Sequence, residues 1–318
     1  MNLLVTGGCG FIGSNFIEHV IEKKRVHKLV NVDCLSYAGS LDNTKKVYKH
    51  PKYLLEKYDL SNYGKAYDTF YKHDITHVVH LAAETHVDNS ILDADAFLSS
   101  NVLGTHNLLK AALKFKIKRF HHVSTDEVYG HLNKGDKKFS ENTPYDPRNP
   151  YSASKAASDF LVRSYFHTHG LPVTISNCSN NYGPNQHKEK FIPTVINSLL
   201  EGDPIPVYGK GDNVRDWIYV SDHCNALWKI LTKGKLGETY LVGAECEKTN
   251  LEIIHEICKM LNKSPDDYIK FVEDRLGHDF RYAINNCKIF QELKWKPKVK
   301  LKHGIKKTID HYARIIDR

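Results

Sequence analysis

The chain has 318 residues, and its proportions of hydrophobic (41%), aromatic (11%) and charged (26%) residues are typical of a globular protein of one or two domains. No apolar run approaches the roughly 18 residues of a membrane-spanning helix, and no basic segment leads into an apolar one at the start, so we expect neither a membrane partner nor a secretory signal. The net charge of +8 comes from scattered lysines without a nucleic-acid-binding motif, so we expect a solvated basic surface and no nucleic acid partner.

The cysteine count points to free thiols. Seven cysteines are an odd number, and no two of them form a C-x-x-C pair. A disulfide framework and a structural zinc site are therefore not expected, and no metal is assigned. Free thiols are typical of a reducing compartment, so we expect a cytoplasmic protein.

The first 125 residues alternate between short apolar stretches and helical patterns. The expected strands and helices are strands at 3–6, 29–32, 53–55, 77–83 and 119–125 and helices at 12–21 and 94–115. Strands that are apolar on both sides and separated by helices are typical of a parallel sheet covered on both faces. The pattern therefore predicts an α/β fold with a doubly wound, Rossmann-type parallel sheet.

The regular alternation of strands and helices ends after a helix at 151–167 and a strand at 173–177. A long polar loop follows, and the elements expected after it are strands at 204–208 and 217–220 and helices at 191–200, 221–232, 251–261 and 301–315. We therefore predict two parts, a cofactor-binding domain at 1–177 and a smaller carboxy-terminal α/β substrate-binding domain at 178–318.

A glycine-rich loop joins the first strand to the first helix. Gly7, Gly10 and Gly13 are spaced so that the chain can turn tightly and bring bare backbone close to a pyrophosphate at the amino end of the helix. Asp33 ends the second strand 20 residues after Gly13, where a carboxylate accepts hydrogen bonds from an adenosine ribose. A plain turn and a helix cap are the alternative interpretations of these residues.

The residues after Asp33 distinguish between the two nicotinamide dinucleotides. Cys34, Leu35 and Ser36 include no arginine or lysine that would bind a 2′-phosphate, and the carboxylate of Asp33 would repel one. We therefore expect NAD rather than NADP as the cofactor.

Tyr151 and Lys155 lie four residues apart on an expected helix, so both side chains point from one face. A phenol is a poor base at its reference pKa of about 10, and a neighbouring cation favours the phenolate. Thr125, at the end of the fifth strand, can share the hydroxyl group of a substrate. The combination points to a tyrosine that acts as a base on a substrate hydroxyl, although a Tyr-x-x-x-Lys pair alone is common.

Two adjacent carboxyl groups follow Thr125. Oxidation of an alcohol does not need Asp126 and Glu127, but an elimination needs one group to remove a carbon-bound proton and another to protonate the leaving hydroxyl. Neighbouring carboxyl groups can hold different protonation states because like charges oppose joint ionisation. The alternative is structural, with Asp126 capping a turn and Glu127 facing solvent.

Motifs of one family occur through nearly the whole chain. They are TGGCGFIGSN, VVHLAAETHVDNSI, NVLGTHNLL, FHHVSTDEVYG, PYSASKAASD, NCSNNYGP, EKFIP, PVYGKGDNVRDWIYVSDH and RLGHDFRYAIN. Together they resemble the extended short-chain dehydrogenase/reductase superfamily and, within it, the nucleotide-sugar 4,6-dehydratases, above all those acting on dTDP-glucose. The related 4-epimerases share the glycine loop and the Tyr–Lys pair, whereas the Thr–Asp–Glu trio is typical of the dehydratases. Cys9 and Thr85 stand where the family typically has alanine and serine.

The resemblance implies a closed redox cycle. Tyr151, assisted by Thr125 and Lys155, removes the proton of the glucose 4-hydroxyl while hydride passes from C4 to NAD⁺. Glu127 then abstracts the acidified C5 proton, and Asp126, held protonated, protonates the departing 6-hydroxyl. Hydride returns to C6, so a 4-keto-6-deoxy sugar forms with loss of water, and NAD stays tightly bound.

The resemblance also implies two sets of binding residues. The residues expected around NAD are Gly7, Gly10, Phe11, Ile12, Gly13, Asp33, Cys34, Leu35, Ser36, Asp59, Leu60, Leu81, Ala82, Ala83, Thr85, Ser100, Tyr151, Lys155 and Asn181. The residues expected around the nucleotide sugar are Thr85, Thr125, Asn180, Lys190, Phe191, Pro206, Tyr208, Arg215, Asn250, Arg275 and His278. In the second set the arginines and the lysine can neutralise a diphosphate, and the tyrosine can stack on a base.

Members of the family usually pair through two helices, which implies a homodimer. The candidate helices are 94–115 and 151–167, and their expected apolar contacts are Leu108, Leu109, Ala112, Phe160 and Leu161. Three alternatives for the function remain: the same reaction on UDP-glucose, a nucleotide-sugar 4-epimerase, and an NAD-binding protein without catalysis. The adjacent carboxyl groups disfavour the second, and the intact set of catalytic residues disfavours the third.

Overall fold

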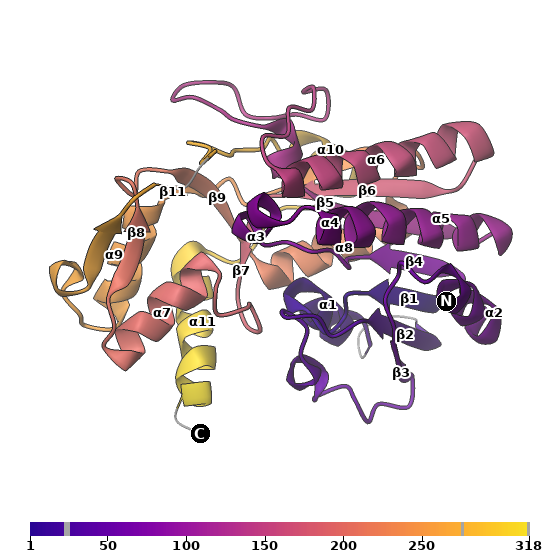
Figure 1. The fold of residues 1–318 in the computed structure, drawn as a ribbon, viewed down its shortest axis with the longest axis horizontal. Coiled ribbons are helices and arrows are strands. Elements are labelled where there is room, and N and C mark those ends of the chain that lie inside the picture. The colour runs from indigo at the N-terminus through magenta and orange to yellow at the C-terminus, as the bar shows by residue number, and fades with distance from the viewer. Residues whose placement is uncertain (22–25, 275–276, 317–318) are drawn as a thin grey trace.

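A parallel β-sheet forms the larger part of the molecule (Figure 1). The computed structural model describes residues 1–21, 26–274 and 277–316, and within them the sheet has seven strands in the order β10–β6–β5–β4–β1–β2–β3. The strands are β1 (Asn2–Thr6), β2 (Lys28–Asp33), β3 (Tyr53–Lys57), β4 (His77–His80), β5 (Arg119–Thr125), β6 (Val173–Cys178) and β10 (Thr239–Val242). The predicted doubly wound parallel sheet is confirmed.

The fourth strand is shorter than the sequence indicates. It ends at His80, whereas the apolar run had predicted a strand to residue 83. The Leu81 N–H still reaches the Thr6 carbonyl, but the N–H groups of Leu81 and Ala82 also both donate to the Thr6 hydroxyl at 3.2 Å. Residues 81–83 therefore leave the sheet beside the carboxyl end of β1 and do not continue strand β4.

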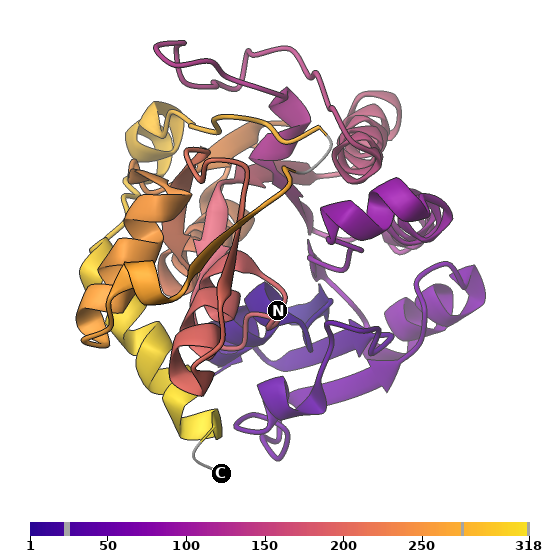
Figure 2. The same cartoon turned by 60° about the vertical axis from the view of Figure 1, so that its left-hand side comes forward.

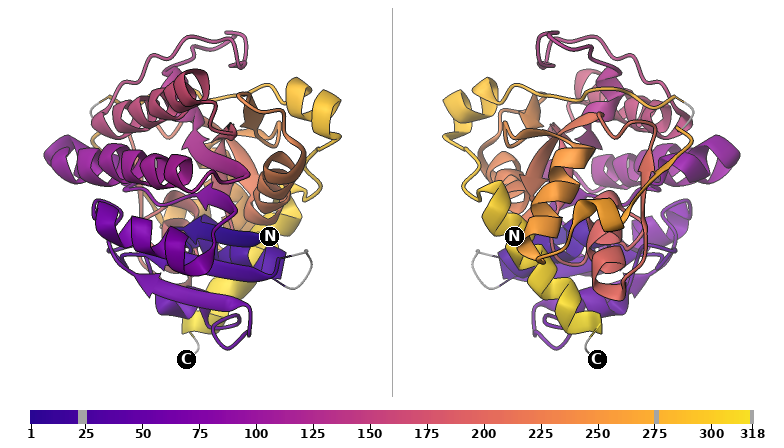
Figure 3. Two further views of the ribbon diagram at one scale, coloured as in Figure 1. Left: turned by 90° about the vertical axis from the view of Figure 1, so that its right-hand side faces the viewer. Right: turned by 90° about the vertical axis from the view of Figure 1, so that its left-hand side faces the viewer.

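Helices cover both faces of the sheet, as Figure 3 shows from two sides. The helices on one face are α2 (Tyr63–His73), α5 (Gly104–Lys114) and α6 (Pro150–His169), and those on the other are α1 (Phe11–Ile21) and α8 (Val220–Lys233). Each face has its own hydrophobic core because successive side chains of a strand point to opposite faces: Leu4 joins one core, and Leu3 and Val5 join the other. Helix α2 had not been expected from the sequence.

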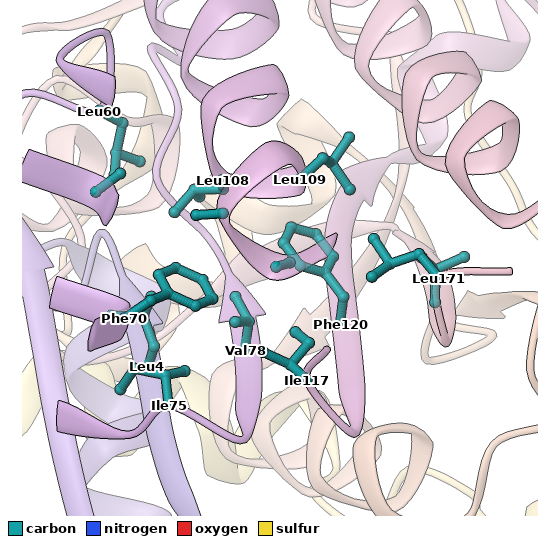
Figure 4. Packing of buried hydrophobic residues seen from close by; sticks show 14 of the residues in the cluster. Leu4, Leu60, Phe70, Ile75, Val78, Leu108, Leu109, Ile117, Phe120 and Leu171 are labelled. Atoms are coloured by element: carbon teal, nitrogen blue, oxygen red, sulfur yellow. The ribbon is translucent and has the colours of Figure 1, made fainter. Parts of the chain in front are cut away.

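The core under α2 and α5 corrects one expectation about the surface. Leu108 and Leu109 of α5 pack against Phe70, Val78 and Phe120 (Figure 4). Together with Ala112, these two leucines are completely buried within the chain. The assignment of Leu108, Leu109 and Ala112 to a dimer contact is therefore wrong, because α5 turns this stripe toward its own sheet.

The long helix expected at 94–115 contains an irregular turn. It consists of α4 (Asp95–Phe97), a π-helical segment η2 (Leu98–Leu103) and α5. Within η2, the buried Asn101 accepts a hydrogen bond from the Glu84 backbone N–H and donates to the Glu84 carbonyl and the Ser154 hydroxyl. Such widened turns commonly occur at functional sites, and this one joins the segment after β4 to α6.

A smaller lobe lies at the left of Figure 1 and comes forward in Figure 2. Its sheets are formed by β7 (Asn180–Tyr182), β9 (Val214–Tyr219) and β11 (Glu247–Thr249), and by β8 (Ile205–Tyr208) with β12 (Ile269–Val272). Its core is formed with α7 (Phe191–Glu201), α9 (Asn250–Met260) and α11 (Leu301–Ile316). The remaining short elements are η1 (Leu41–Thr44), α3 (Val87–Leu92), η3 (Asp126–Tyr129), η4 (Pro265–Asp267) and α10 (Cys287–Leu293).

The chain crosses between the two parts more than once. Beyond residue 177, α8 packs on α1, and β10 pairs in parallel with β6 at the end of the large sheet. The large sheet therefore includes a segment from the part predicted to bind substrate, and residue 177 is not a single cut between two structural units. Across the described ranges, no helix is long and apolar enough to cross a membrane.

Replacing Leu108 by alanine tests the position of α5 in the core. Because the side chain is fully buried, the variant is expected to lose about 2–5 kcal/mol of unfolding free energy in urea denaturation. The matched control is Leu236→Ala, whose side chain is exposed and whose change should stay within about 0.5 kcal/mol. A change as small as that of the control would contradict the burial of Leu108.

Candidate active site

A cavity of about 450 Å³ opens above the carboxyl edge of the large sheet. The strands β1, β2, β4, β5 and β6 each end at or just before a residue that lines it, and these residues are Gly7, Asp33, Leu81, Thr125 and Cys178. The loop after β7 closes one side with side chains from the smaller lobe. This is the position at which parallel α/β sheets bind their ligands.

The glycine loop forms the floor of the cavity. Gly7 has a φ of +70°, and a Cβ on it would come within 2.7 Å of the Ala82 backbone nitrogen. A Cβ on Gly13 would lie 2.1 Å from the Gly7 carbonyl oxygen. The loop therefore requires glycine at both positions, and it leaves the first turn of α1 bare toward the cavity.

Asp33 is fixed by backbone hydrogen bonds. One carboxylate oxygen accepts from the Cys9 N–H and the other from the Leu35 N–H, both at 2.8 Å. Burial raises the pKa of Asp33, while these two bonds act in the opposite direction. Asp33 therefore joins the glycine loop to the turn after β2 rather than capping a helix.

The expected cofactor residues converge on this cavity with one exception. All of them line it except Leu35, whose backbone lies in a left-handed turn with a φ of 56°. Cys9 of the glycine loop does not line the cavity; it is buried under the loop, and its sulfur accepts from the Asn31 amide at 3.3 Å. Cys34 and Cys178 are the cysteines that reach the cavity.

The cavity lining fits a large polar ligand. Ser124 and Ser179 each have a buried hydroxyl oxygen without a hydrogen-bond partner, and the side-chain carbonyl of Asn180 is in the same state. Buried polar atoms are costly unless they are paired, so these atoms require a ligand or water. Together with the bare glycine backbone, they fit the phosphates and hydroxyl groups of a dinucleotide.

The Tyr–Lys pair lies on α6, which starts with a capping box. The side chains of Asn149 and Ser152 bond reciprocally to backbone N–H groups, and Pro150 occupies the first turn. This start fixes Tyr151 at the cavity, where its hydroxyl is hydrogen-bonded to Thr125. One turn later, the Lys155 ammonium donates to the Val123 carbonyl at 2.9 Å.

The electrostatics of Tyr151 differ from the expectation. Burial raises its pKa well above the usual value, and the negative charge of Glu127 raises it further. The hydrogen bond from Thr125 acts in the lowering direction. The sequence argument considered positive charge beside the phenol, and it missed that burial and a nearby carboxylate oppose the phenolate.

The two carboxyl groups occupy different environments. Asp126 is 2% exposed, and one of its oxygens has no hydrogen-bond partner, whereas Glu127 is only partly buried. Burial raises the pKa of Asp126 well above its usual value, and the charges of Glu127 and Asp216 add to this. Thr125, rather than Asp126, caps η3, because its hydroxyl oxygen accepts from the Glu127 N–H at 3.2 Å. Both carboxyl residues line the cavity, against the purely structural interpretation.

The expected nucleotide-sugar residues divide into two groups. Thr85, Thr125, Asn180 and Lys190 line the cavity. The residues that do not reach the cavity lining are Phe191, Pro206, Tyr208, Arg215, Asn250 and His278, and Arg275 lies outside the described residues. Phe191, Pro206, Tyr208, Arg215, Asn250 and His278 belong to the smaller lobe. Phe191 stacks on Trp217 there with ring centres 5.8 Å apart, and the rings of Tyr208 and His278 lie 6.4 Å apart.

Arg215 binds the backbone of the segment at residues 279–280 through its guanidinium group. Its guanidinium donates to the carbonyls of Val214, Asp279 and Phe280 and lies 4.4 Å above the ring of Tyr282. Tyr282 is buried and donates to Asp279 at 2.5 Å, and the charge of Glu127 acts on it. The sequence analysis missed Tyr282, because no spacing connects it to the residues around β5.

Other lining residues were also missed. They include Ser124, Cys178 and Ser179 at strand ends, Ser99 in η2, Glu84 bonded to η2, and Gln186 and His187 in the polar loop. The rule that ligands meet the carboxyl ends of parallel strands could have found the first three. No local pattern marks the others. In the described part of the chain, no group of three or more His, Cys, Asp or Glu side chains could hold a metal ion.

The family model of GDP-mannose 4,6 dehydratase matches residues 4–308. A dTDP-glucose 4,6-dehydratase of Haemophilus influenzae is 44% identical over 98% of this chain and 98% of its own length. A dTDP-glucose 4,6-dehydratase of Mycolicibacterium smegmatis is 48% identical over 98% of this chain and 93% of its own length.

Solved structures agree with these relatives. The dTDP-glucose 4,6-dehydratase DesIV of Streptomyces venezuelae, crystallised with NAD and TYD bound, has a TM-score of 0.96 and 39% identity over 99% of this chain and 97% of its own. A Thermus thermophilus UDP-glucose 4-epimerase in complex with NAD has a TM-score of 0.91 and a lower identity of 28%, over 98% and 99% of the two chains. The chain thus belongs to the nucleotide-sugar 4,6-dehydratase family, and within it to the dTDP-glucose 4,6-dehydratases.

Proposed function

We propose that this protein removes water from dTDP-glucose to form dTDP-4-keto-6-deoxyglucose, with NAD as a cofactor that is regenerated in each turnover. The observation that carries the proposal is that Asp126, Glu127 and Tyr151 line one cavity and that the two carboxyl groups differ in burial. A simple alcohol oxidation needs the phenol alone, whereas an elimination also needs an acid and a base. The relatives named for this reaction support the proposal.

NAD, when bound, accepts hydride from the sugar and later supplies it again. The bare glycine loop would hold its pyrophosphate, and Asp33 would accept hydrogen bonds from its adenosine ribose. Relatives solved with NAD bound support this assignment. The described lining places no arginine beside Asp33 to bind a further phosphate, which favours NAD over NADP.

Tyr151 acts on the 4-hydroxyl of the sugar. Its hydroxyl is already bonded to Thr125, so a substrate hydroxyl at this position would be shared by both side chains. Lys155 presents its charge from the same face of α6 and favours the phenolate against the effect of burial. In this assignment Tyr151 takes the proton, Thr125 orients the hydroxyl and Lys155 stabilises the negative charge.

Asp126 and Glu127 carry out the elimination. The raised pKa of Asp126 keeps its carboxyl protonated, so it can donate a proton to the departing 6-hydroxyl. Glu127 is more accessible and takes the C5 proton once the 4-ketone has acidified it. Thr85, Asn180 and Lys190 would contact the sugar diphosphate, and the aromatic and basic residues of the smaller lobe would hold the nucleotide farther along.

Product analysis tests the function directly. The purified protein without added NAD is expected to convert dTDP-glucose to a product lighter by one water, because the cofactor is retained through turnover. UDP-glucose is the matched comparison and should give a lower kcat/KM, and Tyr151→Phe should give no product. A product of unchanged mass, or consumption of one NAD per sugar, would refute the dehydration.

Asp126→Asn tests the acid. The amide has the same size but no proton to donate, so kcat is expected to fall by about 10²–10⁴-fold while binding of dTDP-glucose is retained. The measurement is single-turnover product formation together with a binding titration. The control is Asp136→Asn on the exposed loop after β5, which should keep the rate of the unmodified protein.

Asp126→Asn should lower activity, but it is expected to make the protein more stable, relative to the unmodified protein, as the pH rises. Because the pKa of Asp126 is raised in the folded state, its stabilising contribution is present at low pH and is lost as the pH rises through that folded-state value. Asp126→Asn removes this titration, so the variant should become more stable relative to the unmodified protein as the pH rises. Urea denaturation at acidic and alkaline pH measures the difference, and a constant difference would argue against a buried, protonated Asp126.

We also infer that two chains pair through η2, α5 and α6. Leu98 and Leu103 are exposed on η2, Phe160 on α6 and Leu92 on the adjoining α3, with Leu92 86% exposed. Such a group of large apolar side chains is typical of an interface.

The seven free thiols further support a reducing compartment, which favours the cytoplasm as the place of action.

Leu103→Glu tests this interface. A charge in the centre of an apolar contact should convert the dimer to a monomer, because the buried carboxylate would be desolvated without a partner. Light scattering measures the mass, and Leu236→Glu is the control on an exposed position outside these helices. A monomeric unmodified protein would contradict the inference.

A further inference from the structure

Asp159 is a fully buried carboxylate that none of the proposed steps uses. It lies on α6, one turn after Lys155 and two turns after Tyr151. One of its oxygens accepts hydrogen bonds from the Tyr145 hydroxyl at 2.8 Å and the Asn177 amide at 3.1 Å. The other lies 3.2 Å from His122 Nε2. No hydrogen bond forms at this second oxygen, but the two donors at the first favour the charged form, and the pKa of Asp159 lies below its usual value despite its burial.

Lys155 needs a negative charge close by. It is 4% exposed, and burial lowers its pKa, which favours the neutral amine. Asp159 is the larger of the two influences that raise the pKa of Lys155, and Cys178 is the other. Burial raises the pKa of Cys178 to about 12, so this thiol is neutral and carries no charge to offset the ammonium ion.

We propose that Asp159 is a positioning residue for the reaction, whose buried carboxylate keeps Lys155 as an ammonium ion on the face of α6 that carries Tyr151. The inference rests on the proposed roles of Tyr151 and Lys155. Neighbouring elements hold the carboxylate in place, because its partners come from β5, β6 and the loop before α6. Lys155 meanwhile keeps its hydrogen bond to the Val123 carbonyl, so the two charges are fixed on one helix.

Other titratable groups around this pair do not replace the carboxylate. The groups that face the pair are His122 on β5, His80 on β4, Cys178 on β6, Tyr129 on η3, Tyr145 before α6 and Arg163 on α6. Burial lowers the pKa of both histidines, so they are neutral, and burial raises the pKa of both tyrosines. Arg163 donates to the Tyr145 hydroxyl at 3.0 Å, and this hydroxyl in turn donates to Asp159, so the guanidinium contacts the carboxylate only through Tyr145.

Asp159→Asn is the test, because the amide keeps the shape and removes the charge. Competitive labelling of the NAD-containing protein with acetic anhydride, mapped by peptide mass, gives the midpoint pH at which Lys155 becomes a reactive amine. This midpoint is expected to fall by about 1–3 pH units in the variant, and the alkaline limb of the kcat/KM profile should move in the same direction. An unchanged midpoint would overturn the proposal.

Two controls separate charge from packing. Asp159→Glu keeps the charge, so the midpoint pH for Lys155 should lie close to that of the unmodified protein. Tyr145→Phe removes a hydrogen bond within the same cluster but leaves the carboxylate, so its midpoint should stay within about 0.3 pH units of the unmodified protein. A shift as large in Tyr145→Phe as in Asp159→Asn would assign the effect to packing and overturn the proposal.

The labelling readout also separates this proposal from the catalytic roles. If Tyr151→Phe remained active, the role of Tyr151 would fail, while the midpoint for Lys155 would still report on Asp159. If Asp159→Asn did not fold, Asp159→Ser, which leaves room for water, would take its place with the same expected shift. Failure of both variants to fold and retain NAD would assign Asp159 to the fold alone and overturn the proposal.

Discussion

The active site depends on one constraint, the burial of ionisable side chains near the end of β5, where they are shielded from solvent. Burial raises the pKa of both Asp126, in η3, and Tyr151, in the first turn of α6. For Asp126 the effect matches the need for a protonated acid. For Tyr151 it opposes the need for a base, so a compensating positive charge must be present.

The same constraint explains why α6 carries so many buried polar residues. A charged amine placed to compensate Tyr151 is itself desolvated, and it needs a counter-charge behind it. That counter-charge is costly unless donors surround it, and Tyr145 and Asn177 supply them. Each of these polar side chains thus compensates for the one before it, starting from a buried phenol that must lose its proton.

The sequence predicted those parts of the molecule in which local pattern and tertiary structure agree. The strand at 119–125 and the glycine loop were found because a continuous apolar run and a fixed spacing determine them. Strand β10 and helix α2 were missed, because a short run such as residues 239–242 has no pattern that reveals its partner. Asp159 and Tyr282 were missed for a related reason, since their importance comes from contacts with residues far away in the chain.

The return of the chain to the large sheet has a consequence for dissecting the protein. A fragment ending near residue 177 would lack β10, and β6 would become an unpaired edge with free backbone donors and acceptors. It would also lack α8, and the apolar side chains of α1 and of the sheet face that α8 covers would be exposed to water. Long unprotected edges beside apolar surface promote aggregation, so we expect a fragment of residues 1–177 to aggregate when it is expressed alone.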